Sequence, residues 1–176
     1  MGLFGPPDVK KLKAEKNIKG LIKALKYKKS IDIPEKAAKA LGKIGDKEAV
    51  KPLIKALKKK KLYYDFKKTH VMFKMGELGI GSVEQSDKFG RIRVAAATAL
   101  GAIKDTRAID PLIDLLNDEI TEVRKAAEKA LVNFGEKAYR RLKRILSLPI
   151  HIYTEGAAKR ILRKMERKKN KYNNHT

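Results

Sequence analysis

The sequence predicts an all-α protein, built as a right-handed α-solenoid of stacked helical hairpins, and three observations support this fold class. An alanine-rich pattern recurs along the chain at spacings typical of helical repeats. A second pattern, with apolar residues at i, i+3, i+4 and i+7, predicts a helix with one buried stripe. Turn-forming residues separate the two patterns. Because one such hairpin cannot bury its apolar face alone, we expect the hairpins to stack around one core.

The alanine-rich pattern predicts the first helix of each unit. Its three copies begin at Ile33, Ile92 and Val123. The spacings are 59 and 31 residues, so the longer one is nearly two repeats. In the first copy Ala37 and Ala38 share a face with Leu41, and these small side chains let a neighbouring helix approach closely.

A turn is predicted after each first helix. Gly45 is suited to a left-handed helix stop, and Asp46 is suited to the N-cap of the next helix. Asp105 and Glu136 occupy the matching position in the later units, and Lys104 stands where the turn glycine is expected.

The second pattern predicts the second helix of each unit, over residues 18–26, 50–58, 109–117 and 139–147. Pro52 and Pro111 lie near the predicted helix starts, where the missing N–H does little harm. We expect one core that contains ten leucines. They are Leu21, Leu25, Leu41, Leu53, Leu57, Leu100, Leu112, Leu116, Leu131 and Leu142.

Residues 37–57 read Ala-Ala-x-Ala-Leu-Gly-x-Ile-Gly-Asp-x-x-Ala-Val-x-Pro-Leu-Ile-x-Ala-Leu, which resembles the HEAT-like repeat named after the phycobilisome (PBS) lyases. Residues 95–116 resemble it well and residues 126–146 more weakly. The family's usual arginine in the first helix is present as Arg93 and Arg124, but Pro34 replaces it in the first unit. This resemblance implies an α-solenoid whose second helices line a concave binding face.

We expect residues 1–169 to form a single HEAT-like repeat domain. Within it, residues 58–88 fit the pattern poorly, and they are either a degenerate repeat or an insertion with one helix and a glycine-rich loop. A helix over residues 153–168 is expected to cap the array. Residues 170–176 are expected to form a flexible basic and polar tail.

The charge of the chain is its strongest functional signal. It has 43 Lys and Arg against 20 Asp and Glu, a net charge of +23, which favours an acidic partner. The excess lies in residues 1–88 and 136–176, whereas residues 89–135 contain seven groups of each sign. With many Lys, one Gln and no Cys, the composition is also similar to that of proteins from hot environments.

Catalytic and cofactor patterns are missing from the sequence. The three histidines are far apart, no cysteine is present, and Gly76-x-x-Gly79-x-Gly81 lacks the spacing of a dinucleotide loop. We therefore expect no metal, no organic cofactor, no small-molecule substrate and no enzymatic activity. A chromophore lyase or another enzyme is a distant alternative. No stretch has the length of a membrane span, so we expect a cytoplasmic protein without a membrane partner.

Equivalent exposed positions of the second helices predict the binding site. These positions are Lys19, Lys23, Lys26, Lys51, Lys55, Lys58, Asp110, Asp114, Arg140 and Arg144. The primary hypothesis is a non-catalytic scaffold whose concave face binds an acidic protein partner. The alternative is a nucleic-acid-binding module that contacts phosphates without reading the base sequence. Asp110 and Asp114 favour the protein partner, because they would repel a phosphate backbone. The same lysines could also simply solvate the helices.

Overall fold

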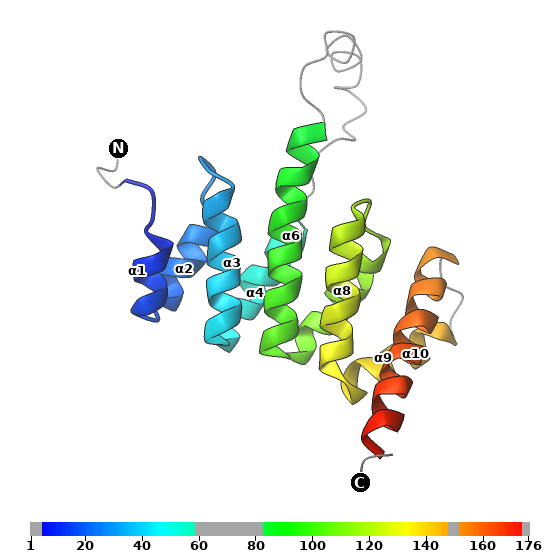
Figure 1. Ribbon diagram of the computed structural model, residues 1–176. Coiled ribbons are helices and arrows are strands. Elements are labelled where there is room, and N and C mark those ends of the chain that lie inside the picture. Colours follow the sequence, from blue (N-terminus) through cyan, green and yellow to red (C-terminus); the bar gives the residue numbers. More distant parts are fainter. Residues whose placement is uncertain (1–4, 59–82, 148–151, 174–176) are drawn as a thin grey trace, which may run out of the picture.

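The computed structural model describes residues 5–58, 83–147 and 152–173, and within these ranges every regular element is a helix. The helices are stacked along one direction in chain order, as an α-solenoid (Figure 1). The predicted all-α solenoid fold is therefore confirmed.

A short helical hairpin starts the array. Asp8 is the N-cap of helix α1 (Val9–Ala14), and its side chain accepts hydrogen bonds from the backbone N–H groups of Lys10 and Lys11. Asn17 is the N-cap of helix α2 (Ile18–Leu25), and its side chain accepts from Gly20 N–H at 2.8 Å. These caps satisfy amide groups that have no partner within the helix.

The first complete unit contains α3 (Asp32–Ile44), the 3₁₀ turn η1 (Lys47–Ala49) and α4 (Val50–Leu57). Gly45 ends α3 with a φ of 81° in the left-handed region, and its N–H donates to Leu41 O. Asp46 then caps the next turn by accepting from Glu48 N–H at 2.7 Å. The predicted turn chemistry is therefore confirmed for this unit.

The second unit contains α6 (Val83–Ile103), η2 (Thr106–Ala108), α7 (Ile109–Asp114) and η3 (Leu115–Asn117). Lys104 takes the left-handed position of the turn with a φ of 57°, although it has a side chain. Asp105 accepts from Arg107 N–H at 3.0 Å, as an N-cap should. Hydrogen bonds from the Arg107 guanidinium lower the pKa of Asp105 to about 2.

The last unit contains α8 (Thr121–Phe134) and α9 (Glu136–Leu146), followed by α10 (Ile152–Asn173). The prediction for Glu136 was wrong, because this residue is the first residue of α9 and not its N-cap. Gly135 alone connects the two helices, with a φ of 60° and a ψ of −134° that favour glycine. Helix α10 also extends beyond the expected end at residue 168, so the start of the predicted tail is helical.

The helices form two layers. Helices α3, α6 and α8 pack side by side in one layer, and α2 and α4 pack beside each other in the layer behind (Figure 1). Glycines allow the close approach within the first layer. A Cβ atom on Gly42 would lie 2.6 Å from Ala99 Cα, and one on Gly101 would lie 2.8 Å from Ala130 Cα. Gly42 and Gly101 thus set the distance between successive units, a role that the sequence pattern predicted for Ala37 and Ala38.

The core lies between the two layers and contains all ten predicted leucines, none more than 3% exposed. Alanines of α3, α6 and α8 fill the remaining space, and α10 covers the end of the core with Ala158, Ile161 and Leu162. Full burial of each leucine side chain contributes about 1.5–3 kcal/mol, so this core is the main source of stability.

Ion pairs join successive units. Arg91 on α6 contacts Asp32 and Glu35 on α3 at 3.0 and 2.6 Å. Glu128 on α8 is bound by Arg160 and Lys164 of α10. Burial raises the pKa of Glu128, but the hydrogen bonds from these two cations outweigh burial, and the pKa stays below its usual value.

The family arginines have structural partners. Arg93 is 1% exposed, and its Nη2 donates to Asp118 Oδ1 at 2.9 Å. Arg124 donates to the carbonyl oxygen of Asp118 at 2.7 Å. In the first unit Pro34 is buried in the core and offers no such bond.

Most of the segment 58–88 lies outside the described residues, as do all three histidines and the glycines at positions 76–81. The backbone is helical again from Val83 onward. Among the helices that the structure describes, none has the length and apolar character needed to cross a membrane.

Candidate partner-binding surface

Six lysines lie on the exposed sides of two neighbouring second helices. We name them the lysine ladder: Lys19 and Lys23 of α2 with its C-cap Lys26, and Lys51 and Lys55 of α4 with its C-cap Lys58. All six are exposed, and none forms an ion pair with a described carboxylate. The positions of these lysines follow from the helix register. Leu21 and Leu53, buried at equivalent positions, direct the flanking lysines of both helices to the same side.

The acidic positions of α7 differ from each other in their contacts. Asp110 accepts two hydrogen bonds from Arg141 on α9, at 2.5 Å from Nε and 3.0 Å from Nη2. This bidentate contact raises the pKa of Arg141 and neutralises the carboxylate. Asp114 is exposed, and it has no ion pair with any described cation. Only Asp114 therefore presents unpaired negative charge among the predicted site residues.

The predicted arginines of α9 also differ. Arg140 is tied to Glu136 one turn earlier, at 3.1 Å. Arg144 is exposed and has no carboxylate partner within the described residues. The predicted set therefore contains paired groups at Asp110 and Arg140, and unpaired groups in the lysine ladder, Asp114 and Arg144.

A cleft of about 280 Å³ lies between the end of α4 and α7. Leu57, Pro111 and Leu115 give it apolar walls, while Lys58 and Asp114 stand at its edges. The cleft borders the end of the lysine ladder, because Lys58 belongs to both.

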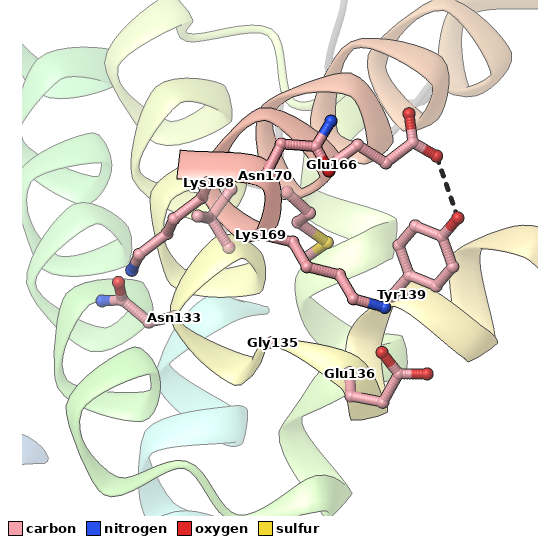
Figure 2. Close-up of a pocket in the computed structure, with 10 residues that line it drawn as sticks. Asn133, Gly135, Glu136, Tyr139, Glu166, Lys168, Lys169 and Asn170 are labelled. Carbon is pink, nitrogen blue, oxygen red and sulfur yellow. Dashed lines mark hydrogen bonds between the residues drawn. The ribbon is translucent and has the colours of Figure 1, made fainter. Parts of the chain in front are cut away.

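A larger cleft of about 570 Å³ lies at the C-terminal end of the array, among α8, α9 and α10 (Figure 2). Tyr139 donates its hydroxyl proton to Glu166 Oε1 at 2.9 Å across this cleft. Lys168 and Lys169 line one wall and Glu136 lines the other, so charges of both signs surround the opening. The Lys143 ammonium lies 5.3 Å from the centre of the Tyr139 ring, within cation–π range.

Metal binding has no support in this part of the molecule. Across residues 5–58, 83–147 and 152–173, no group of three or more His, Asp or Glu side chains could hold a metal ion.

The inter-unit partners were missed in the sequence, although a signal for them exists. Arg141 follows Asp110 by 31 residues, and Arg160 follows Glu128 by 32. The first separation equals the repeat spacing of 31 residues, and the second exceeds it by one residue. An acid and a base one repeat apart on equivalent helix faces therefore predict an ion pair between neighbouring units.

Two family models match the chain. The model for HEAT repeats matches residues 83–162, and the model for the PBS lyase HEAT-like repeat matches residues 33–59. No curated protein matches the sequence. An engineered protein, whose crystal structure was a target of the Northeast Structural Genomics Consortium, is 21% identical with a TM-score of 0.43. That match covers 90% of this chain and 66% of the engineered one, so this chain spans less than two thirds of it.

HEAT repeats generally serve as protein-interaction scaffolds. The hairpins repeat along the chain, Gly45 and Asp46 form the turn expected of such a repeat, and the two family models match HEAT repeats. This chain is a HEAT-like repeat protein.

Proposed function

We propose that this protein is a non-catalytic scaffold that binds an acidic segment of a protein partner on the face of its second helices. The observation that supports this proposal most directly is the lysine ladder. Six exposed ammonium groups on two adjacent helices lack carboxylate partners within the described residues. Elsewhere the same molecule pairs its cations across units, as at Arg91 and Arg141. Unpaired like charges repel one another, and an acidic ligand would relieve that repulsion.

The end of the ladder favours a protein over a nucleic acid. A phosphate backbone is uniformly negative, so a strand that continued from α4 across α7 would meet the unpaired carboxylate of Asp114. A peptide can place acids over the ladder and a different residue over Asp114. Asp110 would not repel the strand in the same way, since Arg141 neutralises its carboxylate.

Paired alanine substitutions test the proposal. Lys51→Ala with Lys55→Ala should weaken binding of a fluorescein-labelled oligoglutamate peptide by about fivefold, because each exposed ion pair contributes about 0.2–1 kcal/mol. The matched control is Lys125→Ala with Lys129→Ala on α8. Those lysines are also exposed, one turn apart and without carboxylate partners in the described structure. Fluorescence anisotropy at about 0.1 M salt measures the affinity. Equal weakening by both pairs would refute a localised site.

Nucleic acid is the second candidate because α10 is strongly basic. Arg163 and Arg167 are exposed and have no carboxylate contact in the described structure. If phosphates bind there and along the ladder, the affinity for duplex DNA should fall with salt with a log–log slope of about −0.9 per phosphate contacted. DNA binding that exceeds peptide binding and loses slope in the Lys51, Lys55 variant would replace the protein-partner proposal.

A further inference from the structure

The cleft between α4 and α7 is more specific than a charged surface. Its walls come from Leu57 at the end of α4, Pro111 near the start of α7 and Leu115 at the start of η3. Leu57 and Leu115 are core residues that present an edge here, at 2% and 8% exposure. Pro111 contributes a ring and has no N–H group to donate. The walls therefore favour an apolar occupant.

The buried carboxylate that lines the cleft adds no free charge for a ligand. Asp118 also borders the cleft, but its side chain is 1% exposed and its Oδ1 accepts from Arg93 Nη2 at 2.9 Å. The same Oδ1 accepts from Ile120 N–H at 3.0 Å. Because this carboxylate is paired and buried, the exposed charges among the described lining residues are those of Lys58 and Asp114.

The two edges have opposite charges. Lys58 stands at the α4 edge and continues the lysine ladder, whereas Asp114 stands at the α7 edge. Neither forms an ion pair with a described residue. The other acid at a predicted site position on α7, Asp110, is already bound by Arg141. Along the predicted site residues the charge therefore turns from positive to negative at the cleft, and it becomes positive again at Arg144 on α9.

We propose that the cleft holds one large apolar side chain of the acidic partner segment and fixes the direction in which that segment lies. Acidic residues on one side of the apolar residue contact the ladder, and a basic residue on the other side contacts Asp114. The volume of about 280 Å³ accommodates an aromatic ring, since cavities of about 150 Å³ bind benzene. This inference rests on the proposed function, and it specifies the sequence that the scaffold recognises.

Three labelled peptides test the apolar contact and the direction. The first has a run of glutamates, then one phenylalanine and one lysine. The second replaces the phenylalanine with alanine, and the third replaces the lysine with glutamine. We expect the alanine peptide to bind about tenfold more weakly, because most of an aromatic side chain loses its burial. This factor should persist as salt is raised, unlike the contribution of the glutamates.

The wild-type protein should bind the peptide with lysine about threefold more tightly than the peptide with glutamine, because the peptide lysine forms an exposed ion pair with Asp114. Asp114→Asn should abolish that preference. Glu122→Gln is the matched control, because Glu122 on α8 is an exposed carboxylate without an ion pair among the described residues, and it should leave the preference intact. A benzophenone in place of the phenylalanine ring should crosslink to Leu57, Pro111 or Leu115, as located by mass spectrometry.

The outcomes separate the inference from the function on which it rests. Equal binding of the phenylalanine and alanine peptides, with Lys51 and Lys55 still required, overturns the cleft proposal and leaves the acidic-partner function intact. Loss of any Lys51 and Lys55 dependence overturns the proposed function itself. Self-association in sedimentation, with crosslinks at the cleft between two copies, shows that a second copy occupies it and also overturns the inference. The inference is also overturned if duplex DNA binds more tightly than the peptides and crosslinks to the same residues of the cleft.

Discussion

Arg93 shows how a single residue connects the repeat pattern to the stability of the array. Its guanidinium is buried on α6 and bonds to Asp118, which lies between η3 and α8. Asp118 Oδ1 also accepts from the N–H of Ile120 just before α8. The arginine of one unit therefore fixes the start of the next. A buried charge without its partner is strongly unfavourable, so each member depends on the other.

Arg93→Met should lower the free energy of unfolding by about 3–5 kcal/mol, because it leaves the Asp118 carboxylate buried beside an apolar chain. Asp118→Asn should also destabilise the protein, and the double variant should lose less than the sum of the two, with a coupling of about 1–3 kcal/mol. Urea unfolding of all four proteins measures the cycle.

The exposed pair Arg140 and Glu136 provides the comparison. The same cycle there, with glutamine at each position, should give a coupling of only about 0.3–0.5 kcal/mol, as for other helix surface pairs. Additive effects at Arg93 and Asp118 would show that the buried pair does not join the units.

The sequence predicted Arg93 as a family position but not its partner. The reason is that Asp118 follows the helix predicted over residues 109–117, and the sequence does not show where that helix ends. The apolar pattern of residues 109–117 continues without interruption, yet α7 ends at Asp114 and the chain tightens into η3. The pattern of apolar spacing cannot distinguish an α-helical turn from a 3₁₀ turn of the same residues.

At the scale of the elements, the turns between first and second helices were predicted well where glycine and aspartate mark them. Gly45 and Asp46 behave as expected, and so does Asp105. The third turn was wrong because Gly135 makes the whole connection in one residue. A glycine can adopt this backbone conformation, but its presence in a sequence does not say how many residues the turn contains.

The matched turns of the first two units give a direct test of backbone strain. Gly45 N–H bonds to Leu41 O and Lys104 N–H bonds to Leu100 O, both at 3.0 Å, so the geometry is the same. Lys104→Gly should raise the free energy of unfolding by about 0.5–1 kcal/mol, because glycine removes the Cβ conflict of a left-handed residue. Gly45→Ala should lower it by about 1 kcal/mol.

Ala102→Gly is the control for this test. It introduces a glycine two residues earlier, at an exposed right-handed position of α6, and should destabilise by about 0.5–1 kcal/mol. If Lys104→Gly destabilised as much as Ala102→Gly, the left-handed position would not be strained. Chemical denaturation of the three variants in parallel measures the differences.

At the scale of the whole molecule, the fold and the charge make opposite contributions to stability. The core runs through all the units and was predicted from the leucine pattern, because each second helix repeats the same buried stripe. The net charge of +23 adds repulsion that the core must overcome. Ion pairs between units relieve part of that repulsion, and each such pair among the described residues has at least one member within residues 89–135, where acids and bases are equal in number.

Added salt should therefore raise the melting temperature. Screening weakens both the attractive pairs and the overall repulsion, but exposed pairs contribute only about 0–1 kcal/mol each, and the cations outnumber the acids. We expect a rise of a few degrees between about 0.02 and 0.2 M potassium chloride, where the Debye length falls below about 10 Å. Calorimetry or circular dichroism measures this change.

The two double variants of the binding test, at Lys51 and Lys55 and at Lys125 and Lys129, should also differ in melting temperature. Lys51 and Lys55 lie beside the unpaired lysines of α2, so their removal at low salt should raise the melting temperature. Lys125 and Lys129 lie in the segment with balanced charge, and their removal should change the melting temperature less. The difference should vanish at high salt, because it is electrostatic. At a functional site, neutralising the surface charge is expected to weaken binding and to stabilise the fold. If both pairs behaved alike at every salt concentration, the ladder would be an ordinary solvated surface.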